Sequence, residues 1–342
     1  MPIDATHLKF YRSQTVSDTA ANGGRLSTVE IASGVKNNLW PDVPQSERTA
    51  GSTKYRKSFL KVAHPDGLAL IDTLLFVETP TPGGDRVVIF PATQTDTQND
   101  LTGSERVYGG GWLDANAGLG STSVSVNVEA ASDAVFRNGD LIRISDKATV
   151  DDPAGAAEFV RLAPAGAVVW NGAKATLTFA SGQSLANAYV AANTRVASVI
   201  EAGTVRASTD TWGISSANGN YNGWSGSGNP PSILVPDAIG GIEQTWTVTF
   251  TAAGTFTCVG DTLGSVGGGS TASDFAPNHA AFGRPYFTLP FSGWGGTWAV
   301  GDVLSFKTHP AAVAVWQKRI IPPNTGSLSG DRVVIAVSGE SE

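Results

Sequence analysis

The residue types that bind transition metals or act as strong nucleophiles are scarce in this sequence and widely separated. Its histidines lie outside metal-ligand spacing of one another and of the single cysteine, and no HExxH motif is present. Cys258 lies in TFTCVG, where it alternates with Phe256 as in a strand. We therefore expect a small buried residue at Cys258 and, because it has no second cysteine to pair with, no intrachain disulfide. The four histidines are His7, His64, His279 and His309.

Three further patterns resemble functional motifs but lack the context that those motifs need. GWSGSG at 223–228 lies in a polar loop rather than between a strand and a helix, so it is not a nucleophile elbow. GSVGGGS at 264–270 has the glycines of a phosphate-binding loop but neither its lysine nor a following helix. Asp151-Asp152 and DTQND at 96–100 carry ligand types that suit Ca²⁺, although solvated loop acids are the favoured interpretation. The sequence thus predicts no catalytic, cofactor-binding or metal-binding residues, and a protein that is not an enzyme.

Tryptophan is the remaining residue type that could form a site, and the chain has nine. Trp212, Trp224, Trp294 and Trp298 lie in Gly-rich stretches. An exposed tryptophan can stack on a sugar ring or anchor an interface, and a loop tryptophan can also fold back as a plug over a sheet. An interface anchor or a plug is the favoured interpretation, and a sugar site is the alternative.

The elements that would position such residues are predicted to be almost entirely strands. Charged residues make up only 15% of the 342, and glycine is abundant at 40, with Thr, Val, Ser and aromatic residues between the glycines. This composition is typical of many short strands and tight turns. The net charge of −7 argues against a protein that wraps nucleic acid, which needs clustered Lys and Arg. The one dense basic run, KYRKSFLK at 54–61, alternates with apolar residues and predicts the solvated face of a strand.

A six-residue repeat, GDRVVI, occurs in GDRVVIF at 84–90 and in GDRVVIA at 330–336. Gly-Asp occurs at three further places, and each time the following residues are compatible with a strand. Glycine allows the positive φ of a turn, and Asp can accept a hydrogen bond from a nearby backbone N–H. The uneven spacing excludes a solenoid. We interpret the repeat as one local way of starting a strand, used several times, rather than as a duplicated domain.

The predicted fold class is all-β, with several small β-sandwich or β-barrel units, long Gly-rich loops and an extended N-terminal arm. The arm, residues 1–52, is poor in apolar periodicity but has too many apolar groups to remain in water. Helix is hard to place anywhere except at 184–192. The predicted divisions are the arm at 1–52, a small antiparallel β unit at 53–105, a β-barrel-like unit at 106–205 and a C-terminal β domain at 206–342 with long loops.

The N-terminus lacks the basic and then apolar pattern of a signal peptide, and no apolar run approaches the roughly 18–20 residues of a membrane span. We therefore expect a protein made in the cytoplasm that does not span a membrane.

Several stretches resemble structural proteins of Mu-like tailed bacteriophages. The resemblance covers roughly residues 8–342. It is a similarity of short sequence segments and of turn residues, and it includes no catalytic motif. It is carried by KYRKSFLKV, by LALIDTLLFVETPTPGGDRVVIFPATQTDTQNDLTGSERVYGGGWLDA, by FRNGDLIRISDKA with AEFVRL and VASVI after it, and by DFAPNHAAFGRPYFTLPFSGWGGTWAVGDVLSFKTHPAA.

The resemblance implies a virion subunit, assembled in the host cytoplasm, with the tail tube as the leading position. Such a subunit has copies of itself in a ring or tube and other virion proteins as partners. Passing DNA makes only non-adhesive contact, because an acidic lumen repels phosphate. The arm, with Trp40, and the loops 215–232 and 264–283 are the predicted inter-subunit contacts. Tube subunits usually carry one helix on the sheet, for which 184–192 is the weak candidate. The alternative is a baseplate, fibre or head-decoration protein with a carbohydrate-binding surface at Trp224 and Trp294.

Overall fold

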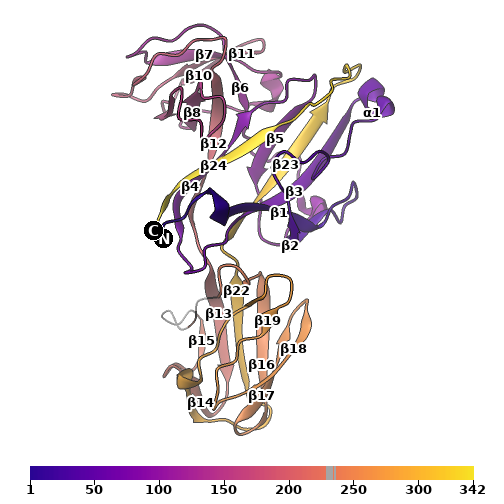
Figure 1. Ribbon diagram of the computed structural model, residues 1–342, viewed down its shortest axis with the longest axis vertical. Helices are drawn as coiled ribbons and strands as arrows, with labels where there is room; N and C mark the ends of the chain where they lie inside the picture. The colour runs from indigo at the N-terminus through magenta and orange to yellow at the C-terminus, as the bar shows by residue number, and fades with distance from the viewer. Residues whose placement is uncertain (229–233, 235) are drawn as a thin grey trace.

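The computed structural model describes residues 1–228, 234 and 236–342, and it is nearly all β. Figure 1 shows three parts stacked along the long axis, which we call the upper lobe, the body and the lower lobe. The described residues contain one α-helix, α1 (Gln45–Ala50), and four single-turn 3-10 helices. None of these helices is long and apolar enough to cross a membrane. The all-β prediction is confirmed, although the named strands of the described residues form no sheet that closes into a barrel.

The body is a sandwich of two antiparallel layers. One layer has the strand order β2-β1-β3-β23-β5, and the other contains β4, the second half of β12, and β24. Apolar side chains from both layers, such as Leu60, Leu75 and Val315, form one buried cluster between them. The bounds are β1 (Leu8–Thr15), β2 (Gly23–Glu30), β3 (Ser52–Val62), β4 (Leu70–Thr79), β5 (Arg86–Pro91), β12 (Arg195–Val205), β23 (Ala312–Ile321) and β24 (Val334–Ser341).

The upper lobe is inserted between β5 and the second half of β12. The first residues of β12, Arg195–Ala197, pair with β6 on one side and with β8 on the other, and Val199–Val205 then pair with β4 of the body. One long strand therefore ties the upper lobe to the body. Its strands are β6 (Gly110–Leu113), β7 (Ser123–Asn127), β8 (Leu141–Ser145), β9 (Ala157–Arg161), β10 (Val168–Asn171) and β11 (Lys174–Thr178).

The lower lobe, residues 208–309, is inserted between β12 and β23. Its main sheet has the order β15-β13-β22-β16-β17-β18, and its core is mostly aromatic. Trp298 stacks on Phe250 with ring centroids 4.3 Å apart. The strands are β13 (Ser208–Ser215), β14 (Asn218–Tyr221), β15 (Ser227–Gly228), β16 (Gln244–Ala252), β17 (Thr255–Gly260), β18 (Gly264–Ser270), β19 (Asn278–His279), β20 (Arg284–Pro285), β21 (Trp294–Thr297) and β22 (Val303–His309).

This nesting differs from the predicted division of the chain. The stretch predicted as a C-terminal domain, 206–342, divides between the lower lobe and two strands of the body, because β23 pairs with β3 and β24 pairs with β4. The stretch 53–105 supplies further strands of the same body rather than a separate unit. The predicted helix at 184–192 is turn and coil. Local pattern shows that a segment is a strand but not which distant strand it pairs with.

The predicted N-terminal arm is part of the body. β1 and β2 form a hairpin, and β1 pairs with β3 from Leu8 opposite Val62 to Arg12 opposite Ser58. Tyr11 and Leu39 of the segment are thus buried by its own chain, whereas Val29 and Val35 stay exposed. The two ends of the chain lie side by side in Figure 1, and the Ile3 N–H donates to Ser341 Oγ at 2.9 Å.

Strand β3 also corrects the prediction of a solvated basic face at 54–61. Lys57 and Lys61 are both 0% exposed. Lys57 Nζ lies 2.7 Å from Asp96 Oδ1 and donates to the Gly24 carbonyl. Lys61 Nζ donates to the Ile239 carbonyl at the junction with the lower lobe, and burial lowers its pKa to about 8. Alternation was the right pattern for a strand, but both faces of β3 are covered.

A second buried charge cluster joins the upper lobe to the body. Glu78 of β4 is 2% exposed and pairs with two buried arginines, Arg143 of β8 and Arg195 of β12. Burial raises the pKa of Glu78, and both guanidinium groups oppose that shift. A buried carboxylate needs such partners because water cannot solvate it there.

Candidate functional site

Cys258 and His309 occupy structural positions. Cys258 is fully buried, as predicted, and burial raises the pKa of its thiol to about 12. His309 lies between Glu243 and Asp210, at 2.8 and 3.0 Å, and their carboxylates raise its pKa. Across residues 1–228, 234 and 236–342, no three side chains of His, Cys, Asp or Glu are grouped so that they could hold a metal ion.

The two predicted acidic loop pairs serve local structure. In DTQND, Asp96 pairs with Lys57 and accepts from Trp316 Nε1 at 2.8 Å, while Asp100 accepts from the Thr97 N–H in a capping box. Asp152 accepts from the Ala154 N–H. Asp100 and Asp152 are thus cap and turn acceptors, and Asp96 is the counter-ion of buried Lys57.

The tryptophans of the lower lobe face inward. Trp212 and Trp298 are 3% and 5% exposed, and Trp224 and Trp294 are partly buried against the same core. Trp294 meets the Tyr221 ring edge-on, with centroids 4.8 Å apart. These rings act as plugs over the sheet, so they do not offer open faces on which a sugar could stack.

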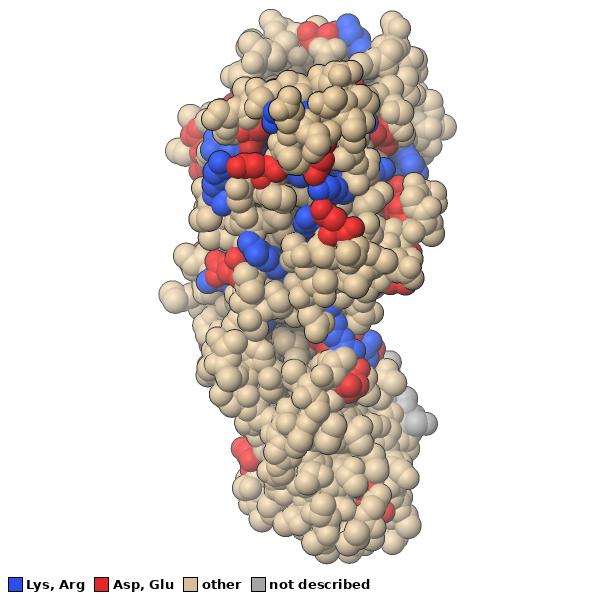
Figure 2. Space-filling model, turned by 90° about the vertical axis from the view of Figure 1, so that its right-hand side faces the viewer, with Lys and Arg blue, Asp and Glu red and all other residues tan. Residues whose placement is uncertain are grey.

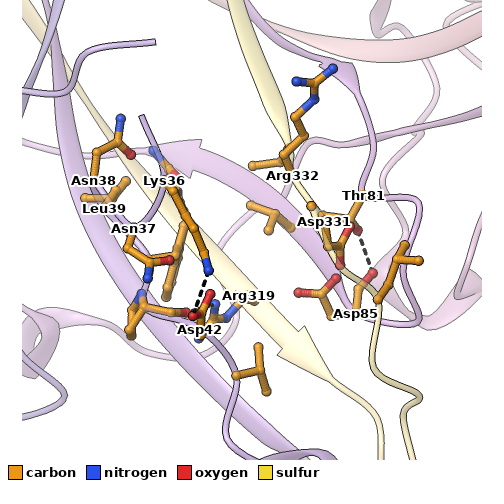
Figure 3. A pocket seen from close by; sticks show the side chains of 18 of the residues that line it. Lys36, Asn37, Asn38, Leu39, Asp42, Thr81, Asp85, Arg319, Asp331 and Arg332 are labelled. Atoms are coloured by element: carbon orange, nitrogen blue, oxygen red, sulfur yellow. Dashed lines mark hydrogen bonds and ion pairs between the residues drawn. The ribbon is translucent and has the colours of Figure 1, made fainter. Parts of the chain in front are cut away.

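The clearest hollow among the described residues is a groove on the body, with a volume of about 980 Å³. One wall is the excursion 31–43 that follows β2, and the opposite wall is the segment 325–335 that leads into β24 (Figure 3). The floor includes Gly84-Asp85 and the second half of β23.

The two copies of the repeat meet in this groove. Each copy does lead into a strand, β5 and β24 respectively, which confirms the local interpretation. Asp85 and Asp331, the same position in the two copies, are neighbours in the groove, and the Gly83 N–H donates to Asp331 Oδ1 at 3.2 Å. Burial and the neighbouring Asp331 raise the pKa of Asp85 to about 6. Two touching carboxyl groups cannot both ionise without cost, so the pair holds a proton more strongly than a solvated acid.

Arg319 of β23 lies on the floor of the groove beneath Trp40 and is 5% exposed. Its guanidinium carbon lies 4.6 Å from the Trp40 ring centroid, and Arg56 lies 5.0 Å from the same ring. Trp40 Nε1 donates to Gln317 Oε1 at 3.1 Å. Trp40, predicted as an inter-subunit anchor, is therefore fixed to its own sheet.

The lower lobe carries a second candidate feature, the outer edge of its main sheet. β18 has the sequence GSVGGGS and, within the described residues, pairs with β17 on one side only. Only eight residues between 208 and 309 are Lys, Arg, Asp or Glu. Figure 2 shows charged side chains gathered over the upper two thirds of the molecule, while the lower lobe is almost free of them in this view.

No family model matches this chain, and no curated protein or solved structure is significantly similar to it. Any functional conclusion therefore depends on these two features and on the sequence resemblance. Sequence reasoning had marked Asp85 and Asp331 through the repeat, and it gave no sign of Arg319.

Proposed function

We propose that this protein is a structural subunit of a tailed-bacteriophage virion that works by self-association, with the tail tube as its position. The proposal combines the resemblance of its sequence to Mu-like phage structural proteins with an all-β fold and the open edge of β18. Copies of the chain are its main partners, and other virion proteins join them.

The observation that carries the proposal is the edge of β18, which has one irregularity in its pairing with β17, between Ser265 and Gly267, but neither charge nor proline. An edge strand presents unpaired backbone N–H and C=O groups, and proteins usually guard such edges with charges, prolines or short length. The edge strands β2, β5, β9 and β24 each carry at least one charged residue, and the uncharged edge strands β10 and β15 have only four and two residues. β18 has seven residues, with no charge and no proline, and most of them are exposed. Such an edge is suited to continuing its sheet into another chain.

A second copy of the same chain fits this edge because the surroundings are nearly neutral. Like charges brought together across an interface are unfavourable, and a chain with a net charge of −7 would meet that penalty over most of its surface. The lower lobe has few charges, and three of them, Asp237, Glu243 and Asp261, are already paired with basic residues. Association through β18 therefore adds backbone hydrogen bonds with little repulsion.

The test is a lysine placed on the edge, compared with the same charge placed one strand inward. Ser265→Lys puts an ammonium on exposed β18, whereas Thr257→Lys puts one on an exposed position of β17, which is paired on both sides. We expect sedimentation velocity to show large species for the parent and for Thr257→Lys, and monomers for Ser265→Lys. A parent that stays monomeric at every concentration, or a Ser265→Lys variant that assembles normally, would contradict the proposal.

The tail-tube position is the more specific part of the proposal and has its own test. Negative-stain images of the assembled species should contain rings or hollow tubes. Solid fibres, or isolated spikes with no lumen, would exclude a tube while leaving self-association intact. A carbohydrate-binding surface is not advanced as a second function, because the tryptophans that suggested it are packed into the lower lobe.

A further inference from the structure

A buried arginine in the groove on the body leaves at least three of its five N–H donors unused. Arg319 Nη1 donates to the Pro41 carbonyl at 3.1 Å. Nε and Nη2 are both buried and have no hydrogen-bond partner among the described residues. Burial lowers the pKa of this guanidinium, which the attraction of Asp85 opposes. An unpaired donor in such a place costs free energy until a ligand or water occupies it.

Two of the unused N–H donors form a particular shape. Nε–H and one Nη–H point the same way along one side of a guanidinium and match the two oxygens of a carboxylate. Trp40 covers one face of the group and keeps the fork in place. The fork is therefore fixed in a shape that fits a planar, two-oxygen ligand, which must displace a covering side chain to reach the buried donors.

The rim of the groove includes exposed apolar side chains among its polar ones. Val35, Leu328 and Val334 line it with 56%, 50% and 36% of their surfaces exposed. The N-terminal end of β24 also lies here, and in the described part of the chain its only sheet neighbour is β4. An extended segment laid along the groove would cover these apolar side chains and reach free backbone groups of β24.

We propose that this groove binds an extended polypeptide segment of another protein that carries a carboxylate side chain flanked by apolar residues. The carboxylate forms a bidentate pair with Arg319, and the flanking side chains lie on Val35, Leu328 and Val334. Asp85 Oδ1, which is buried and also lacks a partner, accepts a backbone N–H of the segment. A phosphate dianion suits the site less well, because Asp85 and Asp331 both line the groove and repel a second negative charge more strongly.

The test uses a blocked, fluorescein-labelled peptide, acetyl-Gly-Val-Leu-Glu-Val-Leu-Gly-amide, and its twin with Gln in place of Glu. Fluorescence anisotropy is measured on the full chain carrying Ser265→Lys, so that the result does not depend on assembly through β18. Saturable binding of the Glu peptide, with the Gln peptide weaker by about tenfold or more, is expected for a charge-assisted bidentate pair.

Matched variants distinguish the effect of the two-donor geometry of Arg319 from the effect of its positive charge. Arg319→Lys keeps the charge and removes the two-pronged donor, so it should weaken binding of the Glu peptide by about tenfold. Arg332→Lys makes the same change at an exposed position of the rim and should alter binding by less than about twofold.

Equal binding of the two peptides, or no saturable binding, would overturn the proposal and leave water as the occupant of the fork. Displacement of the peptide by an equal concentration of inorganic phosphate would assign an anion site instead. Because the two variants are compared on monomers, failure here leaves the proposed self-association standing.

Discussion

Replacing Asp85 by asparagine is expected to stabilise the protein at neutral pH and to have little effect in acid. The residue is 7% exposed and touches Asp331, and burial, followed by this neighbour, raises its pKa from 3.8 to about 6. In the unfolded chain the Asp85 carboxyl has its ordinary pKa of 3.8 and loses its proton near that pH. Between the two values the folded state holds more protons than the unfolded state, so stability falls as the pH rises through that window.

The size of the effect follows from the two pKa values. Each pKa unit corresponds to about 1.4 kcal/mol, so ionised Asp85 lowers the free energy of unfolding by about 3 kcal/mol above pH 6. Asparagine has a similar shape, carries no charge and can donate to Asp331. We expect Asp85→Asn to raise the Tm of the body by about 5–10 °C near pH 7.5 and by almost nothing near pH 4.

Differential scanning calorimetry at both pH values measures this change. Asp133→Asn is the matched control, because Asp133 is also largely buried but is paired with Arg86, and its loss should destabilise the protein at neutral pH. A lower Tm for Asp85→Asn at neutral pH, or the same change at both pH values, would refute the account of the acid pair.

Three further changes test other parts of the fold. The pKa of His309 is raised, first by its hydrogen bond to Glu243. The stabilisation from this charged pair is therefore complete below the ordinary pKa of 6.5 and is lost as the pH rises through the folded value. His309→Asn should lower the free energy of unfolding most in mild acid, as measured by urea unfolding. Trp298→Ala removes a ring stacked on Phe250 and should destabilise the lower lobe by about 3–5 kcal/mol, seen as an earlier calorimetric transition. Glu78→Gln leaves its two buried arginines without a counter-charge and should cost about 3 kcal/mol in a chemical denaturation series; a loss near zero would mean that water reaches the cluster.

Much of the local structure could be predicted from the sequence. Gly-Asp at 84–85, 139–140 and 301–302 is followed directly by β5, β8 and β22. Alternation also identified β7 and β16 as strands and placed Cys258 inside. These are short-range properties, because a turn residue and a period of two depend only on neighbours in the chain.

The arrangement of the lobes could not be predicted, because it depends on pairing between distant segments. β23 pairs with β3 along ten residues, and nothing in either segment specifies the other. The same uncertainty affected the N-terminal segment. Its apolar residues indicated that they pack against another surface, but not whether that surface belongs to the same chain or to another subunit. Lys57 and Lys61 appeared solvated since their partners, Asp96 and the Ile239 carbonyl, come from elsewhere in the chain.

The only sign of the candidate groove in the sequence was the repeated six-residue segment. GDRVVI marked Asp85 and Asp331, but their meeting depends on β5 and β24 lying in facing layers of the body. Arg319 belongs to AVAVWQKRII, where an arginine near the end of a strand is ordinary. Its importance comes from burial beneath Trp40, which only the folded chain provides.

The central claim is that copies of this chain join through the open edge of β18, and amide hydrogen exchange tests it most directly. We expect those backbone amides of residues 264–270 that face away from β17 to become protected as the concentration of the parent protein rises, and to remain unprotected in Ser265→Lys. Assembly that leaves those amides exchanging at the rate of the monomer would contradict the claim.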